Sequence, residues 1–519
     1  MSARDGGAGY GPVTAAWLRF PALRRWDLDR RQTALLAGIL LLTLLAYLRS
    51  LGNGFVYDDF PAIVRNGHLH KWSFIWYAIT RDVWWYYGAG PPPQSSYYRP
   101  LQNIWLGLSF HLVGRHPAGW HLLKILLHLC AVVLSFRLAQ LITASTSVAL
   151  LVALLFGLLP TNGAAVVSIQ ALGEPLAAVF AMGSFCAFIS RSKTHWLGMG
   201  WALLLFAGAA LSHETAVLFP LLIGAYVFLL ETPDGDPALS QGESLSLARR
   251  IGKALAWSAP FVGVSLLYMG ARLLVLGRAG ILGLPQHMIY LSGSKTPISL
   301  FRPHPRLSPT QILMTIPTVM VHYVELTFFP WIAGPAHDVN EVMAPSFSRV
   351  YLPLAILIVL AILGDLLARN SPRRRLYLFC VIWSLVVLAP AFSFNNIVAF
   401  VQDRYLYLAS FVFCLWLAIL ATQFAGSSVA LRRAVTAAVV GVIVANVVKL
   451  WRIEPIWHDN VTLFSRCVED SPNSLYYHRM LATTLMRKGD FAGAAAHLRF
   501  IYKPANTSPE SQESPESKD

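Results

Sequence analysis

Long apolar runs, separated by short polar segments, occupy most of the chain between residues 33 and 450. Many of these runs are near the length of about 20 residues with which a helix spans the hydrocarbon core of a bilayer. The pattern therefore predicts an all-α polytopic membrane protein. The runs lie at about 33–51, 117–141, 145–159, 164–190, 196–211, 214–230, 254–276, 312–333, 349–367, 376–394, 405–423 and 431–450.

The distribution of arginine and lysine predicts the orientation of these runs. Residues 1–32 are basic and should stay cytoplasmic, and the first run has no small-residue cleavage site, as in a retained signal anchor. The basic residues at 369 and 373–375 fall on the cytoplasmic side only if 312–333 is re-entrant or interfacial. We therefore expect about 11 crossings and an outer C-terminal tail.

Two further segments are expected on the outer side. Residues 52–116 form a long aromatic-rich loop, and residues 451–504 resemble one tetratricopeptide repeat with helices at about 474–488 and 490–502. One such repeat cannot bury its own face, so it must pack on the rest of the chain or on a protein partner. Residues 505–519 are rich in Ser, Pro and Glu and are expected to be disordered.

Composition narrows the function classes. The chain is 55% hydrophobic and 13% charged, with a formal net charge of +15. Because the cations lie mostly in short loops between the apolar runs, membrane orientation and anionic headgroups explain them, and we find no nucleic-acid motif. The five cysteines show neither a disulfide framework nor metal-ligand spacing.

An acidic pair follows the first apolar run. Asp58 and Asp59 lie in Asn-Gly-Phe-Val-Tyr-Asp-Asp-Phe, just outside the membrane and among aromatic residues. A partly desolvated carboxylate there can act as a general base on a hydroxyl group or help to hold a divalent metal, although no metal-ligand spacing supports a metal. Taken alone, the pair also fits a simple turn.

Other polar residues at or near the ends of the apolar runs collect on the same outer side. They are Arg99, His121, Lys124, His128, Glu174, His213, Glu214, Arg272, Asp403, Arg404 and Tyr405. Ionisable groups in membrane segments are costly and usually mark function. Arginine matches phosphate oxygens and a carboxylate can activate a hydroxyl, so the set suits a phosphate-bearing lipid substrate. Each residue also has a structural interpretation: a core hydrogen bond, an internal ion pair, or a cation that reaches the headgroups.

Several short motifs resemble the transmembrane and tetratricopeptide-containing O-mannosyltransferases and their bacterial relatives. They are the Asp-Asp segment, Tyr98-Arg99-Pro100-Leu101, Trp120-His121-Leu-Leu-Lys-Ile-Leu-Leu-His128, Leu211-Ser212-His213-Glu214-Thr215, Arg272-Leu-Leu-Val-Leu-Gly277 and Asp403-Arg404-Tyr405-Leu406-Tyr407-Leu408. The chain departs from the family pattern at Leu159-Pro160, at Gly163 and at His213, and it carries about one repeat instead of a long array.

The resemblance implies a GT-C fold over residues 33–450 and transfer of a mannose-like sugar from a polyprenyl-phosphate donor to a protein or glycan acceptor. It implies Asp58 or Asp59 as the catalytic carboxylate and Arg99, Arg272 and Arg404 as donor-phosphate contacts. His121, His128, Glu174, His213, Glu214, Asp403 and Tyr405 would support the site.

Two other function classes stay open at this stage. A transporter or flippase of lipid-linked sugars would explain the charges, but the sequence shows no two-half symmetry. A catalytically inactive scaffold could use the repeat to bind a protein partner. For location, we expect an integral membrane protein, with a bacterial plasma membrane favoured over the endoplasmic reticulum.

Overall fold

The structure is a computed structural model that describes residues 28–86, 95–191, 196–231, 247–277, 307–369, 373–392 and 400–502. Within these ranges every regular element is helical and no strand occurs. The predicted cytoplasmic segment 1–32, apart from its last residues, and the predicted disordered tail 505–519 lie outside the described residues.

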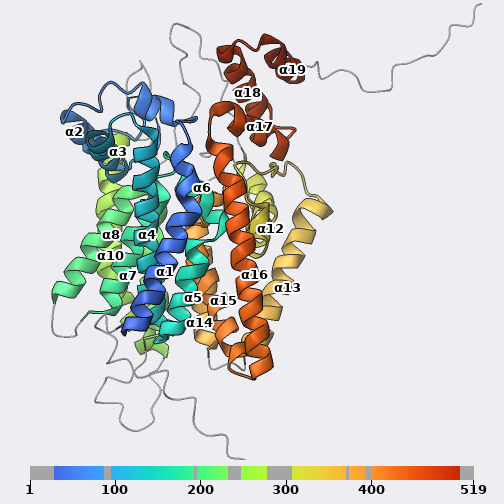
Figure 1. The fold of residues 1–519 in the computed structure, drawn as a ribbon. Helices are drawn as coiled ribbons and strands as arrows, with labels where there is room; N and C mark the ends of the chain where they lie inside the picture. Colours follow the sequence, from blue (N-terminus) through green and yellow to red (C-terminus); the bar gives the residue numbers. More distant parts are fainter. Residues whose placement is uncertain are drawn as a thin grey trace, which may run out of the picture.

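The apolar runs form the helices of one bundle (Figure 1). Its helices are α1 (Arg30–Tyr47), α4 (Pro117–Thr143), α5 (Thr146–Gly157), α6 (Gly163–Val167), α7 (Gly173–Ile189), α8 (Trp196–Ser212), α9 (Phe219–Leu229), α10 (Leu247–Leu276), α12 (Pro309–Phe328), α13 (Leu352–Ala368), α14 (Arg374–Leu388), α15 (Ser410–Ala425) and α16 (Val429–Ile453). This arrangement confirms the predicted all-α polytopic membrane protein.

Six of the described helices are long and apolar enough to cross a membrane, or seven if the bent pair α5 and α6 forms one span. Four shorter apolar helices, including α7 and α15, accompany them. Helix α12 is not among the six, and it contains Pro317 within its length. The number of 11 crossings, with 312–333 re-entrant, stays a prediction.

The C-terminal ends of α1 and α16 meet at one end of the bundle. Helix α1 leads through a short 3-10 turn, Leu48–Gly52, to the acidic segment, and α16 ends beside it (Figure 1). The Asn53 side-chain amide donates to the Glu454 carbonyl at 2.9 Å, and the Gly54 N–H donates to the His458 carbonyl at 3.0 Å. These bonds place the loop after α1 and the C-terminal unit on the same side.

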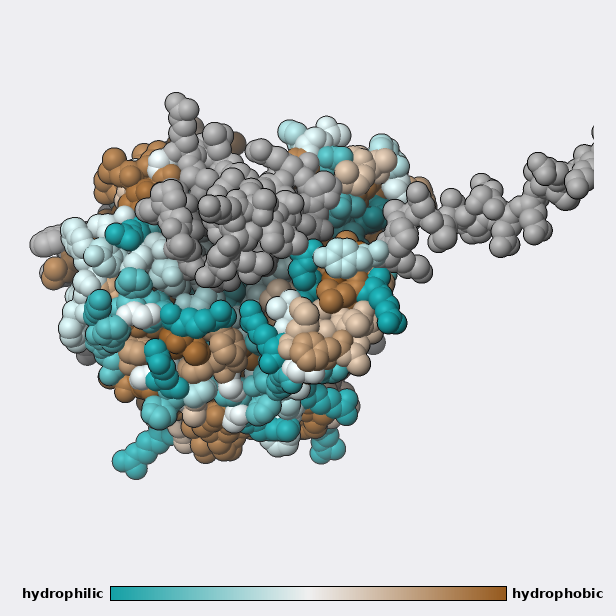
Figure 2. Space-filling view, turned by 90° about the horizontal axis from the view of Figure 1, so that it is seen from above, coloured by the Kyte–Doolittle hydropathy of each residue, from teal (hydrophilic) through white to brown (hydrophobic). Residues whose placement is uncertain are grey.

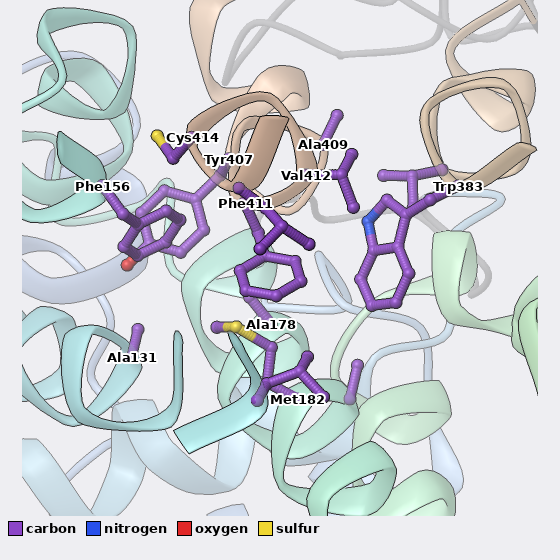
Figure 3. Close-up of a cluster of buried hydrophobic side chains, with 14 of the residues drawn as sticks. Ala131, Phe156, Ala178, Met182, Trp383, Tyr407, Ala409, Phe411, Val412 and Cys414 are labelled. Carbon is purple, nitrogen blue, oxygen red and sulfur yellow. The ribbon is translucent and has the colours of Figure 1, made fainter. Parts of the chain in front are cut away.

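Below this end, aromatic side chains fill the core between α4, α5, α7 and α15 (Figure 3). Phe156, Tyr407 and Phe411 are fully buried, and the Trp383 indole N–H donates to the Leu408 carbonyl at 3.1 Å. Large buried rings of this kind contribute much of the packing energy of a core. They give the turn that follows Gln402 a rigid base.

The C-terminal unit consists of α17 (Asn460–Asp470), α18 (Leu475–Lys488) and α19 (Phe491–Ile501). Gly489 adopts a left-handed conformation (φ 84°) between α18 and α19, as is usual after a helix C-terminus. The two helices predicted at about 474–488 and 490–502 are therefore present, while their assignment as a tetratricopeptide repeat stays a prediction.

The apolar face of this unit is not free. Leu463, Phe464 and Leu481 are buried against Val56 of the first outer loop and Ala336 of the segment after α12. Figure 2 looks onto this end of the molecule and shows hydrophilic residues spread over it, with apolar patches between them. Helices α2 (Ser73–Thr80) and α3 (Pro100–Val113) of the first outer loop lie at the same end (Figure 1).

Candidate active site

The acidic pair sits in a tight turn in which its two carboxylates have different surroundings. The Asp59 N–H donates to the Val56 carbonyl at 2.9 Å, and the Asp59 carboxylate accepts the Val56 N–H at 2.9 Å. Asp59 is 2% exposed, whereas Asp58 is only partly buried. Asp59 is thus engaged by its own turn, whereas the Asp58 carboxylate accepts no hydrogen bond from the described residues.

Burial raises the pKa of both carboxyl groups. Burial raises the pKa of Asp58 to about 7, and the positive charge of Arg404 opposes this rise. For Asp59, burial raises the pKa to about 8, with the Val56 N–H opposing and the charge of Asp58 adding to the rise. A carboxylate with a pKa near the working pH meets the requirement for a general base.

Arg404, whose charge acts on Asp58, forms an ion pair with a second carboxylate. Its Nε lies 3.0 Å from Oε1 of Glu174, whose side chain is 10% exposed. The same Glu174 oxygen lies 3.8 Å from Nε2 of His213. The Arg404 side chain is still 35% exposed, so part of it is open to an anion from outside the protein.

A bidentate ion pair continues the network. Nε and Nη2 of Arg99 lie 2.8 and 2.6 Å from the two carboxylate oxygens of Glu214, and both side chains are largely buried. This fork-to-fork geometry is the strongest form of an arginine–carboxylate pair. Nη1 of Arg99 also donates to Oε1 of Gln102 at 3.5 Å, so all three guanidinium nitrogens are engaged within the protein.

Arg272 lies near the C-terminal end of α10 and donates a hydrogen bond to the backbone just before α3. Its Nη2 donates to the Ser96 carbonyl at 2.9 Å, and the hydroxyl of Tyr268 on the same helix donates to the Tyr98 carbonyl at 2.9 Å. Arg272 thus contacts the backbone that leads to Arg99. Its role as a donor-phosphate contact stays a prediction.

His121, Lys124 and His128 of α4 are buried at different depths of the bundle. The Lys124 ammonium donates to the Ala171 carbonyl at 2.5 Å. His128 lies about 10 Å along the helix from His121, because seven residues rise 1.5 Å each. It bonds Tyr407 Oη at 2.7 Å and the Gly157 carbonyl at 3.1 Å. The structure therefore places His128 in the aromatic core and not among the charges around Glu174.

Asp403 has a partner that the sequence did not indicate. Its Oδ1 lies 2.7 Å from Nε2 of His337, and its Oδ2 accepts the Gly334 N–H at 2.9 Å. Nδ1 of His337 lies 3.1 Å from Nε2 of His322. Asp403 therefore fixes the segment after α12 to the turn that carries Arg404. No local motif surrounds His337, so only the tertiary contact reveals it.

The immediate surroundings of Arg404 form a small recess. It is lined by Ala164, Ser168, Ala171, Gly334, Pro335, Gln402, Asp403, Arg404 and Trp457. The Tyr405 ring lies beside it, with its centroid 5.7 Å from the Arg404 guanidinium carbon. Within the described part of the chain, no three His, Cys, Asp or Glu side chains are grouped as metal ligands would be.

The chain matches known proteins over part of its length. No family model matches the chain. Protein O-mannosyl-transferase Tmtc2 of Drosophila melanogaster is 30% identical over 186 residues, which cover 34% of this chain and 20% of the relative. The human protein O-mannosyl-transferase TMTC1 is 33% identical over 159 residues, which cover 30% of this chain and 17% of the relative.

Among solved structures, the Archaeoglobus fulgidus oligosaccharyltransferase tethered with an acceptor peptide aligns with a TM-score of 0.44 at 13% identity, over 95% of this chain and 61% of that chain. A score of this size does not by itself establish a common fold. The alignments with these two O-mannosyl-transferases span about a fifth of the relatives' length. The chain is therefore similar, over a part of their length, to the transmembrane and tetratricopeptide-containing O-mannosyltransferases, as its motifs indicate.

Proposed function

We propose that the chain is a membrane glycosyltransferase that moves a mannose-like sugar from a polyprenyl-phosphate donor to a hydroxyl group of a protein or glycan. The observation that carries this proposal is the position of Asp58, within range of the positive charge of Arg404, at the end of the bundle where the loop after α1 and the C-terminal unit meet. A general base and a phosphate-binding cation at a membrane surface are the two groups that such a transfer requires.

In this mechanism, Asp58 takes the proton of the acceptor hydroxyl while the hydroxyl oxygen forms a bond to the anomeric carbon of the sugar. The bond between that carbon and the phosphate oxygen breaks, and its electron pair leaves with the polyprenyl phosphate. Arg404 stabilises the negative charge that develops on this leaving group. Glu174 holds Arg404 in place through the 3.0 Å ion pair.

The remaining predicted residues have supporting roles in this scheme. Asp59 shapes the turn that carries Asp58, and Asp403 anchors the turn that carries Arg404. The role of Arg99 as a donor-phosphate contact stays a prediction, because its bidentate pair with Glu214 balances its charge. The supporting roles of His121, Arg272 and Tyr405 stay predictions. His128 bonds Tyr407 in the aromatic core and so stands apart from the reacting groups.

The partners of the reaction follow from the same scheme. They are the lipid-linked donor, an acceptor protein or glycan, and the bilayer itself. The matched relatives named above are proteins of animals, so the expected bacterial plasma membrane is not supported by them and stays a prediction. A protein partner at the C-terminal unit stays a prediction as well, and in this structure the apolar face of the unit is already buried on Val56.

The test is a transfer assay in membranes that contain the full chain. Labelled mannosyl-phosphoryl polyprenol is supplied with candidate acceptor proteins, and the product is identified by mass spectrometry. Wild-type chain should yield an acceptor with one added hexose, and an Asp58→Asn variant of equal abundance should not. Movement of the intact labelled lipid between leaflets without any labelled acceptor would favour the transporter alternative.

A further inference from the structure

The residue before the acidic pair has an unusual backbone. Tyr57 adopts a left-handed conformation with φ 47°, and Ala144 is the other described non-glycine residue with positive φ. Ala144 sits at the C-cap of α4, where this conformation is common. Tyr57 has no such position, and a residue with a bulky side chain persists in this region only when its surroundings impose it.

The surroundings of Tyr57 come from the C-terminal unit. The Tyr57 N–H donates to Oδ1 of Asn460 at 2.7 Å. The Tyr57 ring packs edge-on against Phe464, with centroids 5.7 Å apart, and its hydroxyl bonds the hydroxyl of Tyr476. These contacts join residues about 400 positions apart in the sequence, and they hold the backbone, the ring and the hydroxyl of one residue.

The residues before Tyr57 are held from the same direction. A side chain at Gly54 would meet the His458 carbonyl oxygen at 3.1 Å, and the Gly54 N–H donates to that oxygen. Val56 is 4% exposed and belongs to the same apolar cluster as Leu463 and Phe464. The C-terminal unit thus holds the whole approach to Asp58, and the left-handed residue sets the direction in which the chain leaves it.

We infer that the C-terminal helical unit is a positioning element for the transfer reaction: Asn460, Phe464 and Tyr476 hold Tyr57 in its left-handed conformation and thereby fix the backbone that presents Asp58 to the site. This inference rests on the proposed role of Asp58. Tyr57 is a positioning residue in this scheme, since it acts through its neighbour. The unit is then a working part of the transferase domain and not only a docking module.

One pair of variants separates backbone conformation from the ring. Tyr57→Gly and Tyr57→Ala both remove the ring, but glycine adopts positive φ without steric cost whereas alanine does not. We expect Tyr57→Gly to retain about five- to thirtyfold more transfer activity than Tyr57→Ala, from the cost of the left-handed conformation. Equal activities of the two variants, at equal abundance in the membrane, would overturn the role of the backbone conformation.

A second set tests the contacts themselves. Tyr476→Phe and Asn460→Ala each remove one hydrogen bond to Tyr57, and each should lower kcat by about two- to tenfold without a change in KM for the donor. Tyr502→Phe and Asn473→Ala are matched controls, because both residues are exposed and neither contacts the loop in the structure. An equal effect of controls and test variants, or a rise in KM alone, would overturn the inference.

A readout that needs no transferase activity distinguishes failure of this inference from failure of the proposed function. Amide hydrogen exchange of the peptide that contains residues 54–60 is measured in the full chain in detergent. Asn460→Ala and Tyr476→Phe should speed exchange there, while Asn473→Ala should not. Faster exchange without any measurable transfer by wild type would refute the proposed function alone. Unchanged exchange would refute the positioning role.

Discussion

If Asp58 is the general base, transfer must depend on pH in a way that its surroundings set. Burial raises the pKa of Asp58 to about 7, and only the ionised form can accept the hydroxyl proton. The rate should therefore rise with pH. The ionised fraction goes from about 0.1 at pH 6 to about 0.9 at pH 8, so kcat should increase about tenfold over this range.

Three substitutions, one at Asp58 and two at Arg404, test whether Asp58 sets this pH profile. Asp58→Asn should lower kcat by about 10²–10⁴-fold and remove the rise between pH 6 and 8, because no base remains. Arg404 opposes the raised pKa of Asp58. Arg404→Gln should therefore move the rising limb to higher pH, whereas Arg404→Lys keeps the charge and should leave the limb near 7 while weakening donor binding.

The assay measures initial rates of mannosyl transfer in detergent-solubilised membranes from pH 5.5 to 8.5, with donor binding measured separately. Asp59→Asn is the matched control, since Asp59 is engaged by the Val56 N–H and should not set the limb near 7. A flat wild-type profile, or near-normal transfer by Asp58→Asn, would refute the assignment of Asp58. If the rise in rate with pH disappears only in Asp59→Asn, the general base is Asp59 and not Asp58.

Three other measurements test the structure around the site. Glu214→Gln removes one partner of a largely buried bidentate pair and should cost about 3 kcal/mol of stability or more, read as a lower Tm; an unchanged Tm would contradict the pair. Burial raises the pKa of Asp59 to about 8, so the folded state keeps this proton at pH values where the unfolded chain has lost it. The free energy of unfolding and Tm should therefore fall as pH rises toward 8, and Asp59→Asn should show a flatter decline of Tm between pH 5 and 8.5. A cysteine probe near residue 505 should react from the outer side and one within 235–245 from the cytoplasm; the reverse result for residue 505 would refute the topology.

The helices could be predicted from the sequence because the bilayer imposes a simple rule on composition and length. Apolar runs such as 117–141 and 431–450 correspond to α4 and α16 within a few residues. The 312–333 run does not give a helix that qualifies as a span, and its Pro317 lies inside α12. The apolar runs therefore located these helices. How many of the helices cross the membrane depends on tertiary interactions that the runs do not encode.

For the site, the sequence indicated residue types better than it indicated their partners. Arg404 and Glu174 were both expected on the outer side, and the structure pairs them. His121 and His128 share a helical face, but their spacing of seven residues places them about 10 Å apart along the helix axis. A helical face carries no information about depth, and depth decides whether a histidine meets the charges or the core.

From sequence alone, the C-terminal unit could pack on the rest of the chain or on a protein partner. The contact between Tyr57 and Asn460 shows that it packs on the rest of the chain. A single repeat must cover its apolar face, and neither its composition nor its period says with what. The structure covers it with the loop that carries the acidic pair, because α1 and α16 both end there. A partner protein that instead required this face would have to displace Val56 and Tyr57, and transfer would then fall as the partner bound. The geometry thus predicts that any partner of the unit either leaves activity unchanged, by binding elsewhere, or inhibits it.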